Sequence, residues 1–199
     1  MIVGAGVALL LNLYMPSIES ELLEDKRHIE ESMYEILMDM SLALKGERLK
    51  KSENHKMEEV KSYLEIGRKR AHQHSNNYFI NEMAHYEKYF EMRSGQFQVM
   101  EYMIKHFDKF SMSVEQGVKV GELTKQLAES TKGKVTVEEL RRILETLRLG
   151  FKESELPRDR EEFENRAMLY QFLNDIELFI AIKANFKQRL SPKEREQYQ

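Results

Sequence analysis

The stretch MAHYEKYFEMRSGQFQVMEYMIKHF, residues 83–107, decides the fold of this chain. Its stripe residues recur in steps of three and four, the spacing that places side chains on one face of an α-helix. The repeating positions are Met83, Tyr86, Phe90, Arg93, Phe97, Met100, Ile104 and Phe107. All of them except Arg93 are apolar, so we predict a long amphipathic helix that packs this face against other elements.

Arg93 is the exception on that face. An unpaired buried charge costs several kcal/mol, so a carboxylate or carbonyl partner is predicted for its guanidinium. Asp175 and Glu177, near the end of the chain, are the acids that we expect to supply it. Tyr89, Arg93 and Gln96 form a polar set on neighbouring faces of this helix. They either grip an anionic or aromatic ligand or fix the helix register, and the structural role is favoured.

The rest of the chain carries further helix signals. Apolar residues in steps of three and four mark the helices, a capping residue begins several of them, and Gly marks some of the ends. Ser113 with Gln116 and Thr136 with Glu139 are capping boxes that predict a helical hairpin, closed by Gly150 and Pro157. The other predicted helices run from Ser17 to Gly46, from about Met57 to Asn77, and from the Asp159 cap with Glu162 to about Leu190.

These signals predict an all-α fold. Only 9 Gly and 3 Pro occur in 199 residues, and a strand-rich fold would need more turn residues. We expect an antiparallel bundle of about five to six helices, some of them long, with a helical hairpin insert. The bundle is predicted to occupy residues 16–190, and the polar residues 191–199 are expected to form a flexible tail.

The first fifteen residues differ from the rest of the chain. Every residue from Ile2 to Leu11 is apolar or Gly, and the composition becomes acidic after Pro16. The stretch is too short to span a bilayer alone, and it lacks the basic start and cleavage site of a secretory signal. Residues 1–15 are therefore predicted to be the end of a truncated transmembrane helix, with a buried core helix as the alternative.

The charge balance argues against nucleic acid as a partner. The chain has 31 Lys and Arg against 34 Asp and Glu, whereas nucleic-acid binding needs an excess of cations to replace phosphate counterions. It contains no Cys, which excludes disulfides, thiol nucleophiles and thiolate metal ligands.

The strongest enzymatic signal is the Glu-x-x-His step of Glu82 and His85. Di-iron bundles need a second such pair and two further carboxylates. The nearest substitute is Asp25 with His28, in an acidic stretch expected to face solvent. We therefore predict that Glu82 and His85 are ordinary surface residues and that the protein is not an enzyme and has no metal site or cofactor, although a metal-dependent bundle enzyme stays an alternative.

Several stretches resemble one bacterial family. YFEMRSGQ (residues 89–96) is similar to the Phe-x-Met-Arg-x-x-Gln signature of the C-terminal domain of the putative aromatic acid exporters. LP (156–157), REEFENRA (160–167) and LNDIELF (173–179) resemble the closing part of the same domain. GAGVALLLN (4–12) resembles the last membrane helix before it. Arg93 and Gln96 match the signature, but the resemblance assigns no binding residue.

The resemblance implies a helical domain on the cytoplasmic side of an inner-membrane protein. Upstream helices would transport aromatic carboxylic acids, and this domain would assist assembly, gating or regulation. The implied partners are the membrane, reached through those upstream helices, further copies of the protein in a homo-oligomer, and a small aromatic acid. The alternative function is a ligand-sensing helical module that binds such an acid.

Overall fold

The fold is entirely helical in the part of the chain that the structure describes. The computed structural model describes residues 18–47, 53–77, 84–107, 115–196 and 198. Within these ranges there are seven helices and no strand. The helices are α2 (Ile18–Leu44), α3 (Glu53–Asn77), α4 (Ala84–Phe107), α5 (Glu115–Thr131), α6 (Val137–Glu153), α7 (Arg160–Arg189) and α8 (Pro192–Glu196). The predicted all-α class is confirmed.

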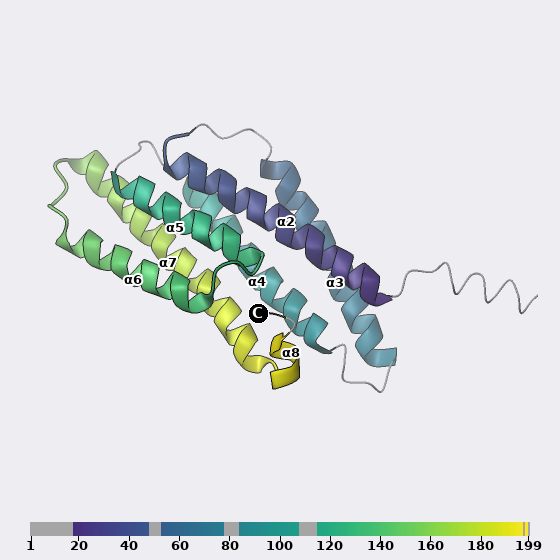
Figure 1. The fold of residues 1–199 in the computed structure, drawn as a ribbon. Coiled ribbons are helices and arrows are strands. Elements are labelled where there is room, and N and C mark those ends of the chain that lie inside the picture. The colour runs from purple at the N-terminus through teal and green to yellow at the C-terminus, as the bar shows by residue number, and fades with distance from the viewer. Residues whose placement is uncertain (1–17, 48–52, 78–83, 108–114, 197, 199) are drawn as a thin grey trace, which may run out of the picture.

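The long helices form an antiparallel bundle. From α2 to α7, successive helices reverse direction along its long axis (Figure 1). Helix α2 packs against α3 and α5, α4 packs against α3 and α7, and α6 covers α5 and α7 from one side. The predicted hairpin is therefore α5 with α6. Helix α5 is the first helix of this hairpin. Because it packs along α2, it is part of the bundle core.

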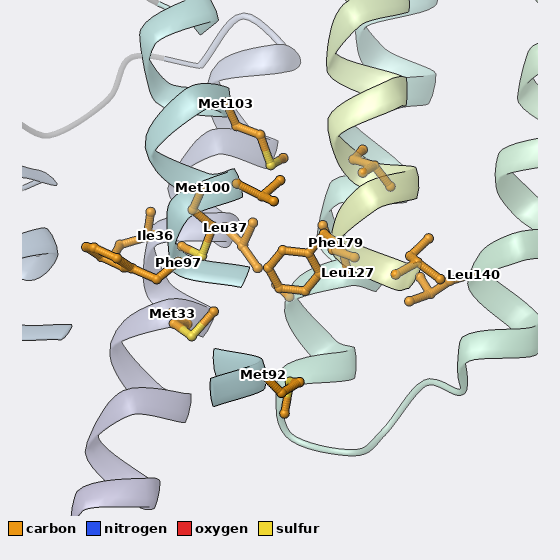
Figure 2. Packing of buried hydrophobic residues seen from close by; sticks show 14 of the residues in the cluster. Met33, Ile36, Leu37, Met92, Phe97, Met100, Met103, Leu127, Leu140 and Phe179 are labelled. Carbon is orange, nitrogen blue, oxygen red and sulfur yellow. The ribbon is translucent and has the colours of Figure 1, made fainter. Parts of the chain in front are cut away.

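One apolar core runs through the bundle. The apolar stripe of α4, the helix formed by the stretch quoted first, faces this core. In Figure 2, Leu37 of α2 and Met100 of α4 lie on one side of Phe179 and Leu127, and Leu140 of α6 lies on the other. On α4, the stripe residues Tyr86, Phe90, Phe97 and Met100 are buried. Methionine suits this role because its unbranched side chain fills irregular gaps.

Three of the predicted helix boundaries are confirmed. Gly46 follows α2 with φ 84°, the left-handed conformation that glycine tolerates best. The side chain of Thr136 accepts a hydrogen bond from the backbone N–H of Glu139, and the Glu139 carboxylate accepts one from the backbone N–H of Thr136. The side chain of Asp159 caps α7 by accepting a hydrogen bond from the backbone N–H of Glu162. Ser113 lies outside the described residues.

One predicted boundary is wrong. Gly150 was expected to help close the hairpin, but α6 continues through it to Glu153. A glycine inside a helix costs only about 0.5–1 kcal/mol relative to alanine. The next residue, Phe151, is buried, and its burial offsets that cost. The helix instead ends at Ser154, which has an extended backbone.

The predictions for the two ends of the chain have different outcomes. Residues 1–15, predicted to end a transmembrane helix, lie outside the described residues. Among the helices that are described, none is both long and apolar enough to cross a bilayer. Flexibility of the tail over residues 191–199 stays a prediction, but Pro192–Glu196 forms α8 and Tyr198 makes several aromatic contacts.

Candidate functional site

Arg93 occupies the centre of the bundle, with its guanidinium buried between α2, α4 and α5. Its Nη2 donates to Oε1 of Glu30 at 2.9 Å and to the carbonyl oxygen of Thr131 at 2.8 Å. Glu30 comes from α2, and Thr131 is the last residue of α5. A cation is favourable at a helix C-terminus, where carbonyl groups lack partners. The prediction was a carboxylate or a carbonyl partner, and Arg93 binds one of each.

The other guanidinium nitrogens bind the two polar residues that the sequence singled out. Nε of Arg93 donates to the Tyr89 hydroxyl at 3.1 Å, and Nη1 donates to Oε1 of Gln96 at 3.0 Å. The Tyr89 hydroxyl in turn donates to Oε1 of Glu30 at 2.9 Å. Nε2 of Gln96 donates to the carbonyl oxygen of Phe179 on α7. The structure therefore brings Tyr89, Arg93 and Gln96 into one network.

We call this network the Arg93 cluster; its members are Glu30, Tyr89, Arg93, Gln96 and Thr131. It joins α2, α4, α5 and α7 through side chains that are mostly buried. Burial acts to lower the pKa of Arg93, but Tyr89 and Glu30 outweigh it and the net shift is upward. Burial also raises the pKa of Tyr89 well above its ordinary value. Arg93 is therefore a cation, and Tyr89 remains a protonated donor.

The acid that pairs with Arg93 differs from the expected one. Asp175 accepts a hydrogen bond from Gln171, and Glu177 pairs with Arg148 on α6. The carboxylate that pairs with Arg93 is instead that of Glu30 on α2. The α2 sequence held a weak signal for this, because Glu30 adjoins Ile29, one of the residues of its apolar stripe.

Two lysines flank the Arg93 cluster. Lys183 on α7 donates to the carbonyl oxygen of Ser130. Burial lowers the pKa of Lys183 to about 7, and the nearby positive charge of Arg93 adds to the effect. Lys26 on α2 lies over the Tyr198 ring, 4.5 Å from its centroid, and burial lowers its pKa as well. The region therefore holds more cationic groups than the one carboxylate of Glu30 balances.

Tyr198 covers the cluster from the C-terminal side. Its ring stacks on Tyr89 with centroids 5.6 Å apart, and it meets Phe186 edge to face at 5.0 Å. It also lies edge-on to His85. Tyr198 was not predicted as a site residue. The available signal was its place as the single aromatic in an otherwise polar tail.

The residues considered for a metal site are placed differently from expectation. His85 was expected at the surface, but it is 6% exposed and packs against Tyr86. Asp25 was expected in a solvated stretch, but it is 3% exposed and accepts from Arg70 at 2.6 Å. Both belong to helix faces that pack against neighbouring helices. Glu82 lies outside the described residues, and among those described no three His, Asp or Glu side chains are grouped to hold a metal ion.

Two cavities lie beside the bundle core. The larger, about 1110 Å³, is a groove bounded by α5, α6 and the segment before and at the start of α7. The smaller, about 340 Å³, lies between the start of α6, the end of α7 and the C-terminal segment. We call it the C-terminal cavity; it is lined by Val137, Glu138, Arg141, Ala184, Lys187, Gln188, Leu190, Arg195 and Tyr198.

Comparison with known proteins gives a family match that covers most of the bundle. A family model described as "Putative aromatic acid exporter C-terminal domain" matches residues 19–184. That range begins at the second residue of α2 and ends within α7. It therefore includes the entire Arg93 cluster and most of the surrounding core.

Two individual proteins are similar to this chain. YqjA of Bacillus subtilis (strain 168), described as uncharacterized, is 33% identical over 187 residues, which make up 93% of this chain and 57% of YqjA. The chain thus spans little more than half the length of that relative. A crystal structure described as a putative membrane protein from Clostridium difficile 630 matches with a TM-score of 0.71 at 16% identity. The match covers 84% of this chain and 99% of that one, and it shows a shared fold.

Proposed function

The chain belongs to the family of aromatic acid exporter C-terminal domains, and from this premise we propose that it is a cytoplasmic accessory domain of an inner-membrane transporter. The domain would assist assembly, gating or regulation, and the upstream part of the protein would export aromatic carboxylic acids. The observation that carries the proposal is the family match over residues 19–184, which takes in almost every described helix. The family description refers to export and names no enzymatic activity.

The position of the apolar segment supports this arrangement. Residues 2–11 are apolar or Gly and precede α2 in the sequence. In the proposal, residues 1–15 end a membrane helix, and the chain then enters α2 at Ile18. In the proposal, a displacement of the membrane helix reaches the domain through α2, the first helix that the structure describes.

The Arg93 cluster supplies a physical route for such a displacement. Glu30 lies on α2, and its carboxylate holds Arg93 of α4 and the hydroxyl of Tyr89. Arg93 also holds the end of α5, while Gln96 holds α7. Because closely packed interiors transmit strain, a shift of α2 would be felt by three other helices. This suits a domain that responds to a transporter or restrains it.

Deletion of the domain from the full-length exporter tests the proposal. Residues 18–199 of this chain would be removed, and the efflux of benzoate from cells and the oligomeric state in detergent would be measured. The amount of inserted protein must be quantified so that efflux is compared per molecule. The proposal predicts slower efflux or a changed oligomer. If both properties are unchanged, the accessory role is wrong.

A further inference from the structure

We propose that the exposed face of α7 packs against the same face of a second copy of this chain, with the two helices antiparallel about a twofold axis at Asn174. This inference rests on the proposed function for its physiological meaning, because it names a surface through which the domain would assist assembly. The pairing itself is argued from the exposure, spacing and charge of residues on α7.

A row of uncharged side chains runs along the outer side of α7. Helices α4, α5 and α6 pack against its other sides. The row consists of Phe163, Ala167, Tyr170, Asn174, Leu178, Ala181 and Asn185, and all of these are exposed except Ala181, which is half-buried. Phe163 and Leu178 are 61% and 52% exposed. We call these seven residues the α7 stripe.

The composition of the α7 stripe is unusual for a solvated helix face. Single exposed apolar side chains are common, but charged residues make up 33% of the chain and none occurs among the seven. The exposed face of α3 shows the contrast, since it carries Lys61, Glu65, Arg68 and Lys69. A continuous uncharged face is typical of a helix that packs against another element.

The spacing of the α7 stripe makes it straight and symmetric. Successive members are four, three, four, four, three and four residues apart. These steps form an eleven-residue repeat of about 3.67 residues per turn, so the stripe stays on one side of the helix. The steps are the same when counted from either end, with Asn174 at the centre. A surface that pairs with its own copy about a twofold axis must be self-complementary, and antiparallel pairing of this stripe meets that condition.

Antiparallel pairing brings residues of similar size to the same level. Ala167 lies level with Ala181 of the second copy, and two small side chains let the helices approach closely. Tyr170 lies level with Leu178 of the second copy, so two large apolar groups meet. The Tyr170 ring already contacts Phe151 of α6 edge to face at 5.3 Å. It therefore loses little conformational freedom when it is buried.

Asn174 places an amide group on the axis. Its Oδ1 accepts a hydrogen bond from Nη2 of Arg148 at 2.7 Å, which orients the amide. Because an amide both donates and accepts, the two copies of Asn174 can bond each other across the axis. A polar pair at the centre of a helix seam fixes its register. The outermost pair, Phe163 with Asn185, is mixed and lies at the two ends of the seam.

The charges at the two ends of α7 favour the antiparallel arrangement. Residues 159–165 contain four acids and one arginine, whereas residues 183–189 contain three basic residues and no acid. Lys183 is turned toward Ser130, but Lys187 and Arg189 keep the positive sign of the second range. The two ranges are equally distant from residue 174, so antiparallel pairing sets the acidic end of each helix beside the basic end of the other. A parallel pairing would bring like charges together.

The contact is expected to be weak in the isolated chain. One helix face from each partner gives an interface at the low end of the sizes found in protein complexes. In a full-length exporter that holds its copies together, the effective concentration of this face would be higher and the pairing stronger.

Cysteine cross-linking tests the pairing at its axis. The chain contains no Cys, so Asn174→Cys places one thiol on the axis, level with the same thiol of the second copy. Under mild oxidation, the 199-residue chain with this substitution should form a disulfide-linked dimer. Ser62→Cys is the matched control because Ser62 is also exposed, on α3, and it should cross-link far more slowly. Equal rates, or no dimer of the Asn174 variant, would overturn the proposal.

Two further variants test the direction of the helices. Phe163→Cys should cross-link with Asn185→Cys when the two proteins are mixed, and neither should cross-link with itself. Self-linked dimers of each variant without the mixed product would show parallel helices and overturn the antiparallel arrangement.

Sedimentation measures the association without a cross-link. The parent chain should form a dimer as its concentration rises. Leu178→Glu should weaken this dimer roughly tenfold or more, because pairing would bury a carboxylate. Leu149→Glu is the matched control, since Leu149 on α6 is 58% exposed, and it should leave the dimer unchanged. Both leucines are exposed, so the variants should keep the fold, as circular dichroism would show. A parent chain that stays monomeric at millimolar concentration, or an equal loss in both variants, would refute the pairing.

The result is separable from the deletion experiment described above. If the chain does not pair through α7 but deletion still slows efflux, the pairing is wrong and the accessory role stands. If the chain pairs as described but deletion changes neither efflux nor assembly, the pairing stands and the accessory role fails.

Discussion

Nη2 of Arg93 lies 2.9 Å from Oε1 of Glu30, in an ion pair whose arginine side chain is only 3% exposed. The pair joins α4 to α2, and the same Nη2 also donates to Thr131 at the end of α5. One cation thus satisfies groups on two other helices. The guanidinium is buried, so it depends on these partners for its hydrogen bonds.

Replacing Arg93 with methionine is expected to destabilise the domain strongly. Arg93→Met keeps a long side chain but removes the guanidinium that donates to the carboxylate of Glu30 and to the carbonyl of Thr131. Removing one partner of a buried ion pair typically costs about 3–5 kcal/mol. Urea denaturation of the variant and the parent chain measures this loss in the free energy of unfolding.

The matched control for Arg93 is Arg148, which pairs with Glu177 near the surface. Arg148→Met is expected to cost less than about 1 kcal/mol, as for most exposed ion pairs. The double variant of Arg93→Met with Glu30→Gln should lose less than the sum of its single losses, because the two residues share one interaction. Similar costs for Arg93→Met and Arg148→Met would show that the Arg93 cluster does not fasten the bundle.

Two glycines should respond in opposite ways to alanine. A Cβ atom on Gly67 would lie 2.3 Å from Cε1 of Phe90, so the buried Phe90 ring would have to shift or α3 and α4 would have to move apart. Gly67→Ala should therefore cost about 1–3 kcal/mol, the usual range for overpacking.

At Gly150, in α6, nothing lies within 4 Å of an added Cβ atom. Gly150→Ala should stabilise the chain by about 0.5–1 kcal/mol through helix propensity alone. The unfolding temperatures of both variants, compared with that of the parent chain, test these predictions. A higher unfolding temperature for Gly67→Ala would contradict the close contact between α3 and α4.

Lys183 should make stability depend on pH in a defined window. Its pKa is lowered to about 7 by burial, whereas that of a lysine in an unfolded chain stays near the ordinary 10.5. Below pH 7 the folded state must hold a buried charge, and this cost fades as the pH rises from about 7 to about 10.5. Lys183→Met should therefore stabilise the domain most in acid, by a few kcal/mol at most.

Urea unfolding of the parent chain and the Lys183→Met variant at about pH 6 and about pH 10 measures this effect. The advantage of the variant should be clear at the lower pH and much smaller at the higher one. An advantage of the same size at both values would mean that Lys183 does not change its charge in this window.

The helices could be predicted from the sequence because their signals are local. The closing helix was expected from the Asp159 cap to about Leu190, and it runs from Arg160 to Arg189. Capping residues and apolar periodicity act within a few turns, so they need no knowledge of the neighbouring elements. The helix end predicted at Gly150 was wrong because α6 continues to Glu153. Burial of Phe151 favours this continuation, and it depends on tertiary packing that the local sequence does not show.

The candidate site could be predicted only in part. Tyr89, Arg93 and Gln96 share one helix, so their meeting followed from its periodicity. The acid that pairs with Arg93 depends on which helices become neighbours, and Glu30 lies 63 residues earlier in the chain. The burial of Asp25 and His85 and the contacts of Tyr198 likewise depend on packing between distant segments. Residue type alone suggested solvent for Asp25 and His85, and Tyr198 belongs to the segment that was expected to form a flexible tail.

Single cysteines can report the side of the membrane on which the domain lies. The chain contains no Cys, so Lys134→Cys, at an exposed position in the turn before α6, would give one reactive thiol in a parent freed of other cysteines. A maleimide reagent that cannot cross membranes should label it in inside-out vesicles and fail to label it in intact cells. Labelling in intact cells would contradict the proposed cytoplasmic location.

The most direct measurement of the central claim is the rate of benzoate efflux per inserted transporter molecule, with and without residues 18–199. The account predicts that the protein lacking the domain exports more slowly or assembles into a different oligomer. Identical efflux rates from identical oligomers would contradict the claim that this helical bundle serves the transporter.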